Sequence, residues 1–311
     1  MKDTDTLYVG IDGGGTNCRG RLRDGAGKLL GEAVAGPANT RLGIAQARQQ
    51  VIKVARDTLL DAGLGDDALA RCHVGAGLAG LHILADKEAF LDWKHPFLSL
   101  KVASDARIAC LGAHDGALDG GIMIIGTGSC GYGLIEGKSI NVGGWGFALS
   151  DGASGARVGY LALRYAIAAQ DGIYDSSSMT DHIMFQFKYS PEEMVLWSAQ
   201  AKPADYAEFA RIVVEYADKN DPVALNLMEQ CGSEAQAILR ALACRGITRI
   251  ALMGGFAEFV EPWLSADVAA LLVPRKYDAR DGAILLAGGH LQPLTPTYEQ
   301  DMGHKDRFGN N

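Results

Sequence analysis

Two glycine-rich turns, each lying between two short apolar runs, constrain the fold of this 311-residue chain more than any other feature. The first turn, residues 13–16, follows the apolar run 7–12 and precedes an alternating run at 18–22. The second turn, residues 126–129, follows the apolar run 122–125 and leads into another short apolar run. Each pattern predicts a strand, a glycine hairpin and a second strand. Because the same order appears twice, we expect two similar α/β halves.

Helical and apolar patterns complete the two halves. In the first half they predict strands at 29–35, 72–76 and 100–103 and helices at 42–62 and 85–93, in the order βββαβαβ. In the second half they predict helices at 153–170, 203–218, 222–244 and 279–288 and a buried strand at 250–253. We expect an N-terminal α/β domain over residues 1–115, a larger C-terminal α/β domain over 116–311, a mostly parallel sheet in each domain, and an irregular tail after Leu291.

Composition restricts the ligands and the compartment. Lys and Arg number 29 and Asp and Glu 37, so the net charge is −8, and the chain lacks the clustered cations that a nucleic-acid groove requires. An anionic ligand must then be held by backbone N–H groups, by a metal ion or by a few side chains. Glycine is unusually frequent, with 40 residues, against an ordinary share of about 7%. With no signal peptide, no apolar run of membrane-spanning length and no CxxC pair among six cysteines, we expect a cytoplasmic protein with reduced thiols and no membrane contact.

The two glycine turns suit the binding of phosphate oxygens. Without a Cβ in the way, backbone N–H groups of a hairpin can point into one concavity, and Thr16 and Thr127 add hydroxyl donors at equivalent places. Asp12 directly precedes the first turn and would repel a phosphate unless Mg²⁺ lay between them, usually through water. Either turn taken singly is equally well explained as a simple hairpin. Two turns at the starts of matching halves favour a polyphosphate gripped between two domains.

Asp105 follows an apolar strand and precedes a helical stretch, a position at which open α/β sheets carry reactive groups. Its carboxylate could accept the proton of a hydroxyl group that attacks a γ-phosphate. The same position suits the N-cap of a helix that begins at Ala106, and the sequence leaves both interpretations open.

A further glycine-rich turn at 143–146 is followed closely by Asp151. The ring face of Trp145 and the carboxylate of Asp151 together suit a sugar, because rings pack on C–H faces and carboxylates accept hydroxyl hydrogens. Trp145 suits a plug at a domain interface equally well.

Two segments, 75–80 and 126–131, match GxGxxG, but this dinucleotide fingerprint has meaning only between a strand and a helix. The second leads into a strand, and the first lacks a clear helix start and a well-placed acidic residue. The sequence contains no GxxxxGK[ST], HExxH or GxSxG, which removes the main support for a Walker-type ATPase, a zincin or a nucleophile-elbow hydrolase.

Taken in order, these segments resemble the N-acetylglucosamine and glucosamine kinases of the BadF/BadG/BcrA/BcrD-type ATPase family, part of the actin-like ATPase superfamily that includes hexokinase. The resemblance runs to about Gly288 and rests on Gly10–Thr16, Ser104–Ala106, Ile125–Ser129, Gly143–Gly146, Asp151 and Leu252–Gly255. It implies two ribonuclease-H-like, actin/hexokinase-like α/β domains with a cleft between them.

The resemblance also implies ATP-dependent phosphorylation of glucosamine or N-acetylglucosamine at O6, with Mg²⁺ as a cofactor and Asp105 as the base. The nucleotide contacts that it implies are Asp12 (to the metal, through water), Gly13, Gly14, Gly15, Thr16, Gly126, Thr127, Gly128, Gly254 and Gly255. The sugar contacts that it implies are Asn39, Ser129, Gly144, Trp145 and Asp151.

One departure from the family pattern follows the tryptophan turn. Family members commonly carry Asp-Glu-Gly-Ser, whereas this chain has Asp151-Gly152-Ala153-Ser154 and so lacks the acidic neighbour. The preference between the amine and its N-acetyl form stays open, and a homodimer is compatible with the chain's size. Two alternatives also stay open: an ATPase that acts as an activator or regulator of a partner protein, although no cysteine pair is spaced for a shared iron–sulfur cluster, and a sugar-sensing regulator, although the sequence suggests no DNA-binding region.

Overall fold

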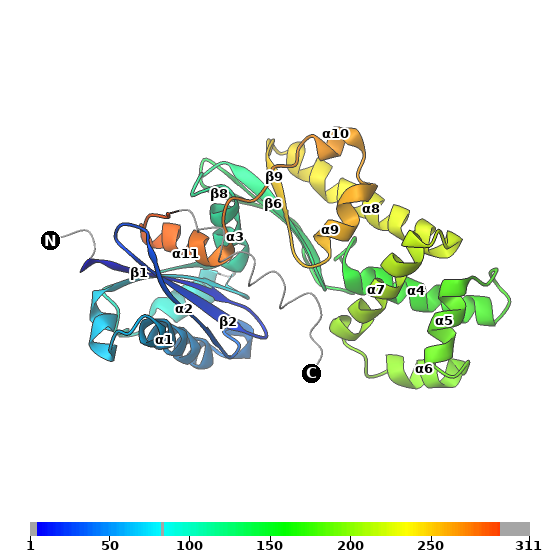
Figure 1. The fold of residues 1–311 in the computed structure, drawn as a ribbon, viewed down its shortest axis with the longest axis horizontal. Coiled ribbons are helices and arrows are strands. Elements are labelled where there is room, and N and C mark those ends of the chain that lie inside the picture. The colour runs from blue at the N-terminus through cyan, green and yellow to red at the C-terminus, as the bar shows by residue number, and fades with distance from the viewer. Residues whose placement is uncertain (1–4, 82–83, 293–311) are drawn as a thin grey trace. The chain divides into compact units, whose positions relative to one another are not determined.

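The computed structural model describes residues 5–81 and 84–292, which form two compact units (Figure 1). Unit 1 contains the described residues up to Ala117 and those from Lys276 onward, whereas unit 2 is Leu118–Arg275. The expected second domain over 116–311 is therefore wrong in its last part, because the chain returns to unit 1 at Lys276. The predicted irregular tail lies, beyond Gln292, outside the described residues.

Unit 1 is built on a five-stranded mixed sheet with the order β3-β2-β1-β4-β5. Its strands are β1 (Leu7–Gly13), β2 (Cys18–Asp24), β3 (Leu29–Ala35), β4 (Cys72–Leu78) and β5 (Ser99–Ser104). β1 and β3 each pair antiparallel with β2, whereas β1, β4 and β5 are parallel to one another. The carboxyl ends of three strands therefore meet at one edge of the sheet, where an open α/β sheet places its ligands.

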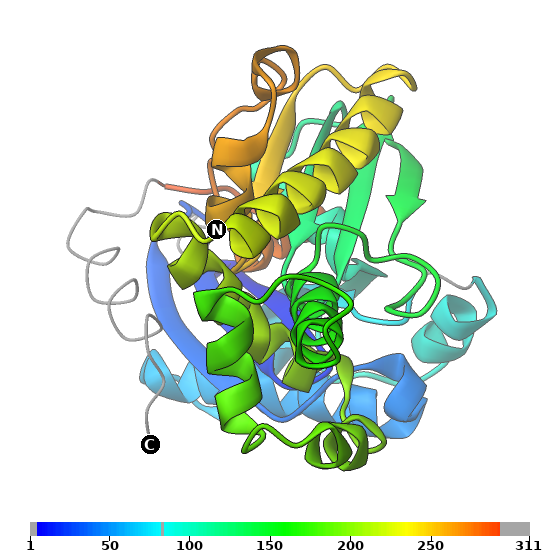
Figure 2. The ribbon, with the colours of Figure 1, turned by 90° about the vertical axis from the view of Figure 1, so that its right-hand side faces the viewer.

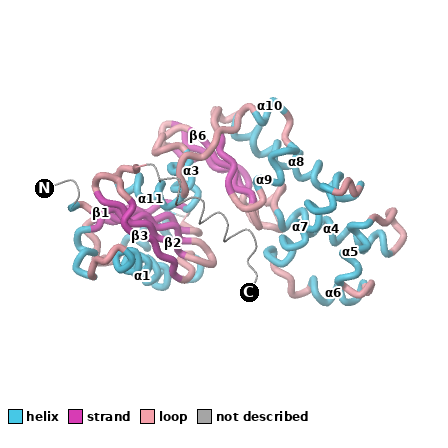
Figure 3. Tube along the Cα trace, viewed as in Figure 1, coloured by secondary structure: helices cyan, strands magenta, loops and turns pink. Residues whose placement is uncertain are grey.

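Helices cover both faces of this sheet, and glycine allows them to approach closely (Figure 3). The helices of unit 1 are α1 (Ile44–Asp61), α2 (Leu84–Leu91), α3 (Asp105–Ala113) and α11 (Ala279–Ala287). On one face, a Cβ on Gly20 would lie 2.8 Å from Thr58 Cγ2 of α1. On the other face, a Cβ on Gly10 would lie 2.0 Å from the carbonyl oxygen of Arg280, where α11 crosses the sheet. Gly75, in the first GxGxxG segment, faces α11 in the same way, which gives that segment a packing role.

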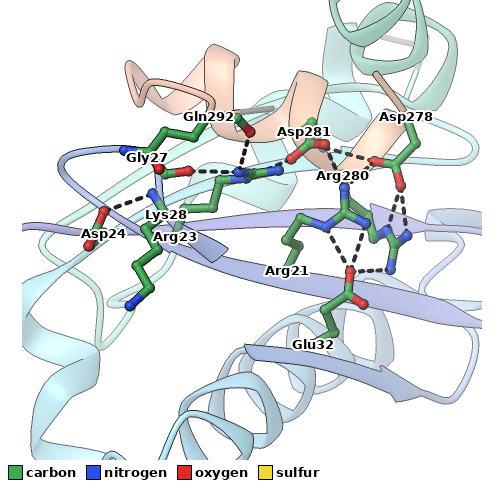
Figure 4. Close-up of polar contacts among 10 residues, drawn as sticks. All are labelled: Arg21, Arg23, Asp24, Gly27, Lys28, Glu32, Asp278, Arg280, Asp281 and Gln292. Carbon is green, nitrogen blue, oxygen red and sulfur yellow. Dashed lines mark hydrogen bonds and ion pairs between the residues drawn. The ribbon is translucent and has the colours of Figure 1, made fainter. Parts of the chain in front are cut away.

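Buried ion pairs fasten α11 to β2 (Figure 4). Arg23 Nε lies 2.9 Å from Asp281 Oδ1, and Arg21 Nη1 lies 2.6 Å from Asp281 Oδ2. Arg21 also contacts Glu32 and Asp278, at 2.7 and 3.1 Å. A buried carboxylate is stable only when it is paired and hydrogen-bonded, and Asp281 has two guanidinium partners. The two contacts of Asp281 join residues more than 250 positions apart, so α11 completes unit 1 rather than unit 2.

Unit 2 repeats the pairing of unit 1 in a four-stranded sheet with the order β8-β7-β6-β9. Its strands are β6 (Gly120–Ile125), β7 (Ser129–Ile135), β8 (Lys138–Gly143) and β9 (Ile250–Met253). β7 pairs antiparallel with both β6 and β8, and β6 is parallel to β9. Two similar α/β halves are thereby confirmed. The predicted mostly parallel sheet is wrong, because each glycine hairpin and the turn after it produce antiparallel pairs.

Helices form the remainder of unit 2, and the long helix α8 runs along its sheet (Figure 2). A Cβ on Gly131 of β7 would lie 2.8 Å from Ile238 Cγ2 of α8. The helices are α4 (Gly155–Gln170), α5 (Ser178–Gln186), α6 (Pro191–Ser198), α7 (Pro203–Asp218), α8 (Pro222–Ala243), α9 (Ala257–Val260) and α10 (Ala266–Ala269). The patterns predicted α4, α7 and α8 but missed the shorter α5 and α6. Within the described residues, every helix is too short or too polar to cross a bilayer.

Candidate active site

The first glycine turn connects β1 to β2 at the carboxyl edge of the unit 1 sheet. The N–H of Gly14 donates to the carbonyl oxygen of Asn17 at 2.9 Å, which closes a tight hairpin. Gly13 has no room for a side chain, because a Cβ there would lie 2.6 Å from a leucine of β4. Gly15 and Thr16 are exposed. The outer half of the turn can therefore approach a ligand while its inner half packs on the sheet.

Backbone hydrogen bonds hold Asn39 beside this turn. The N–H of Ala38 donates to the carbonyl oxygen of Gly14 at 3.1 Å. Asn39 Oδ1 accepts the N–H of Arg41 at 2.9 Å and so begins a short 3-10 turn. The Asn39 Nδ2 atom then lies 3.7 Å from the Cβ position of Gly15. The structure thus brings Asn39 next to the first glycine turn.

Asp12 is the next-to-last residue of β1 and lies close to a second carboxylate, that of Asp105. Burial first, and then the negative charge of Asp105, raise the pKa of Asp12 from 3.8 to about 6. The positive charge of Arg19, the cross-strand partner of Asp12, opposes this rise. Two carboxylates at one sheet edge repel an anionic ligand unless a cation is present, and they provide a base for proton transfer.

Asp105 is the first residue of α3. Ser104 is the N-cap residue, and its Oγ accepts the N–H of Arg107 at 3.2 Å. The Asp105 Oδ1 atom accepts only the neighbouring N–H of Ala106 at 2.8 Å among the hydrogen bonds of the described residues. The N-cap interpretation of Asp105 is therefore wrong, because Ser104 fills that position.

The second glycine turn connects β6 to β7 and is anchored to the start of α4. The N–H of Gly126 donates to the carbonyl oxygen of Gly128 at 2.9 Å. The carbonyl oxygens of Gly126 and Thr127 accept N–H groups of Gly155 and Ala156, at 2.8 and 3.3 Å. The turn is thus rigid, and its threonine is exposed.

At two positions of unit 2, neither the backbone conformation nor the packing requires glycine. Neither Gly126 nor Gly255 has a positive φ, and a Cβ built on either would meet no atom within 4 Å. Their neighbour Gly254 does need to be glycine, because its φ is 96° and a Cβ would lie 2.3 Å from the carbonyl oxygen of Ile125. That contact places the Gly254-Gly255 turn beside the second glycine hairpin. Open space above a glycine backbone fits the close approach of a nucleotide.

Asp151 lies over the second hairpin. Its Oδ1 accepts the N–H of Gly146 at 3.3 Å, and its Oδ2 is 2.9 Å from the Cβ position of Gly128. Burial raises the pKa of Asp151, and the backbone N–H groups of Gly146 and Ser129 partly offset the rise. Gly144 is close as well, with its Cβ position 2.7 Å from Cβ of Cys130 in β7. The second hairpin and the loop that carries Gly144 and Asp151 are therefore in direct contact.

Trp145 is 73% exposed and stands apart from these contacts. The loop that carries it is anchored two residues later by Phe147, whose ring stacks on Tyr206 at 5.4 Å and meets the edge of Tyr160 at 5.8 Å. A free indole on an anchored loop can pack on a sugar face.

The predicted site residues fall into two sets. Unit 1 brings Asp12, residues 13–16, Asn39 and Asp105 to one sheet edge. Unit 2 brings residues 126–129, Gly144, Asp151, Gly254 and Gly255 together, with Trp145 exposed nearby in sequence. The motifs do not include Arg19, which pairs across the hairpin with Asp12, or Glu234, which accepts the N–H of Ala153. The hairpin register predicts the position of Arg19, whereas no local pattern indicates Glu234, which lies far along the chain on α8.

The donor set at Asp12 fits Mg²⁺ bound together with a phosphate. Among the described residues, no group of three or more His, Cys, Asp or Glu could hold a metal ion by itself. Mg²⁺ is commonly held by one or two carboxylates, waters and substrate phosphates. A carboxylate with a raised pKa gains from a neighbouring cation, which favours its charged form.

Repeated mixed sheets, each with a glycine hairpin between its first two strands, define the actin/hexokinase-like class of ATPase fold. A ROK family glucokinase from Streptomyces griseus, solved with glucose and AMPPNP, has this fold. Its TM-score is 0.50 at 18% identity, covering 91% of this chain and 98% of that chain.

The particular family follows from the sequence. Residues 9–287 match the BadF/BadG/BcrA/BcrD ATPase family, and the chain belongs to it. It is 41% identical over 281 residues, 90% of this chain and 95% of the relative, to the Vibrio cholerae protein named glucosamine kinase GspK. A Chromobacterium violaceum crystal structure, provisionally assigned as an N-acetylglucosamine kinase, has a TM-score of 0.81 and 34% identity, covering 91% of this chain and 99% of that chain. The resemblance read from the motifs is confirmed.

Proposed function

We propose that this protein is an ATP-dependent kinase that phosphorylates glucosamine or N-acetylglucosamine at O6. The observation that carries the reaction class is the pair of carboxylates, Asp12 and Asp105, at the sheet edge beside the first glycine turn. The amino-sugar substrate class rests on the 41% identity to a protein named glucosamine kinase.

Asp105 would be the general base. Its charged carboxylate can accept the proton of the sugar hydroxyl as that oxygen attacks the γ-phosphate. Its partner in the described structure is one backbone N–H, so it has acceptor capacity left for a substrate hydroxyl.

The glycine turns would bind ATP. We assign phosphate contacts to the N–H groups of residues 13–16 and 126–128 and to the hydroxyls of Thr16 and Thr127, and contacts with the adenosine to Gly254 and Gly255. Arg19 would add positive charge at the site, since it is exposed beside Asp12. Mg²⁺, held by Asp12 through water, would supply further neutralisation of phosphate charge when bound.

We assign contacts with the sugar to Asn39, Ser129, Gly144, Trp145 and Asp151. The amide of Asn39 and the carboxylate of Asp151 can hydrogen-bond hydroxyls, and Trp145 can cover the apolar face. We also propose that the reaction takes place in the cytoplasm.

A coupled assay of ADP release tests this function. The purified protein is assayed with MgATP and glucosamine, N-acetylglucosamine, glucose or no sugar, and the product of each active sugar is analysed by NMR. We expect ADP formation that requires an amino sugar, and a phosphate on O6. ADP release at the same rate without any sugar would instead favour an ATPase that acts on a partner protein. Phosphorylation at another hydroxyl would reject O6 as the acceptor but would still support the kinase activity.

A further inference from the structure

The turn that carries Asp151 has an unfavourable backbone. Asp151 and Ala153 have φ angles of 54° and 64°, in the left-handed region that side-chain-bearing residues rarely adopt. Gly152 lies between them without a positive φ. Such a conformation persists only when surrounding contacts hold it, and it occurs often at binding sites.

Helix α8 supplies the contacts that hold this turn. The N–H of Ala153 donates to Glu234 Oε2 at 2.9 Å, across 81 residues of sequence. One helical turn earlier, the thiol of Cys231 lies 3.5 Å from the carbonyl oxygen of Ala153. Both polar groups of the Ala153 backbone are therefore engaged by α8.

Glu234 also occupies the space beside Gly152. A Cβ at residue 152 would lie 3.3 Å from Glu234 Oε2, which is tighter than nine in ten real Cβ contacts, and 3.4 Å from Glu234 Cβ, which is close to ordinary van der Waals contact. The glutamate carboxylate is 28% exposed, and Arg157 of α4 lies 4.0 Å from its other oxygen. Glu234 is thus packed against the turn on one side and balanced by a cation on the other.

The conformation of residues 151–153 sets the direction of the Asp151 carboxylate. Asp151 accepts backbone N–H groups of Gly146 and Ser129, and the hydroxyl of Ser129 donates to the carbonyl oxygen of Gly152. If the left-handed conformation relaxed, these contacts would be lost together, because each depends on the path of the same three residues.

We propose that Glu234 is a positioning residue of the sugar site. Through the N–H of Ala153 it fixes the turn 151–153 and thereby the direction of the Asp151 carboxylate. Glu234 itself need not touch the sugar. This inference rests on the proposed function, since it assigns Asp151 to the sugar.

Three substitutions of Glu234 distinguish a role of its acceptor oxygen in positioning the turn from a role of its negative charge. Glu234→Ala removes the acceptor and should raise the KM for the amino sugar about 10-fold or more, with kcat changed less and the KM for ATP within about 2-fold, because misplacement of a binding group by an ångström has effects of this size. Glu234→Gln keeps an acceptor oxygen at the same length and should stay within about 3-fold of wild type. Glu234→Asp keeps the charge but withdraws the oxygens, and should raise the KM for the amino sugar in the same way. It provides the test if the alanine variant does not fold.

Glu229→Ala is the matched control, since Glu229 is exposed on the same helix. The inference is overturned if Glu234→Ala or Glu234→Asp leaves the sugar KM unchanged in an active enzyme. It is also overturned if Glu234→Gln raises the KM for glucosamine but not for N-acetylglucosamine. That result would indicate that the Glu234 charge recognises the ammonium group directly. Absence of sugar-dependent turnover in the wild type is a different result and would reject the proposed function itself.

Discussion

The carboxylate of Asp105 is close enough to Asp12 that its charge, after burial, is the main influence raising the pKa of Asp12 to about 6. Asp12 lies in β1, and Asp105 directly follows the end of β5; these two strands are separated in the sheet by β4. Parallel pairing brings their ends to one edge. The same electrostatic relationship makes the edge unfavourable for an anion and favourable for a cation.

The raised pKa of Asp12 predicts a pH dependence of stability. Between pH 3.8 and about pH 6 the folded state keeps a proton on Asp12 that the unfolded chain has released. The free energy of unfolding contributed by this group therefore falls as pH rises through that window. Asp12→Asn cannot ionise, so above pH 6 it should be more stable than wild type by about 1–2 kcal/mol, with the difference vanishing below about pH 4. Denaturant unfolding in EDTA from pH 4 to 8 measures this. If the free energies of unfolding of the variant and the wild type differ by the same amount at every pH, the charged form of Asp12 is not destabilised in the folded state.

Arg19 predicts an effect on nucleotide binding. The other arginines on its face of β2, Arg21 and Arg23, are buried and paired with carboxylates of α11. Arg19→Gln should raise the KM for ATP about 10-fold or more, because a charge-assisted hydrogen bond contributes about 1.5–3 kcal/mol. Arg19→Lys should recover part of the loss, and the surface variant Arg56→Gln serves as control. An unchanged KM for ATP in Arg19→Gln would remove Arg19 from the phosphate site.

Substitution of Gly126 should weaken ATP binding without lowering the stability of the fold. Because the chain itself leaves room for a Cβ there, Gly126→Ala should change the free energy of unfolding by no more than about 0.5 kcal/mol. The added methyl group should nevertheless weaken ATP binding measured by calorimetry. Gly159→Ala provides the contrast, since its Cβ would lie 1.8 Å from the carbonyl oxygen of Tyr206 and overpacking costs about 1–3 kcal/mol. Full ATP affinity in Gly126→Ala would contradict close approach of the nucleotide to this turn.

Asp281 predicts a large loss of stability without a role in the chemistry. Asp281→Asn removes the buried carboxylate that pairs with both Arg21 and Arg23, which should cost about 3–5 kcal/mol. The exposed pair Arg240–Asp267 offers a control, and Asp267→Asn should cost less than about 1 kcal/mol. Thermal unfolding compares the two variants. Equal losses would show that the α11 network is no more important than a surface ion pair.

Local patterns predicted most of the elements because their signals are local. The hairpin glycines and the period of α8 lie within short windows of sequence, and β9 was predicted with the bounds that the structure shows. α5 and α6 were missed although Ser177 and Ser190 cap them, since each helix has only eight or nine residues and no clear apolar stripe.

Long-range relationships were beyond such patterns. The return of α11 to unit 1 depends on the ion pairs of Asp281 with Arg21 and Arg23, and the hold of Glu234 on Ala153 joins a helix to a distant turn. No local periodicity records either contact. The position of Asp105 was predicted from the strand that precedes it. That Ser104, and not Asp105, caps the helix is seen only from the side-chain hydrogen bond of Ser104.

The proton-accepting role of Asp105 is the central claim, and turnover of Asp105→Asn tests it most directly. The asparagine has nearly the same shape but cannot take a proton, so kcat with an amino sugar should fall at least about 10²-fold. ATP affinity, measured on the same sample by calorimetry, should stay close to that of the wild type. Turnover near the wild-type rate in this variant would contradict the account.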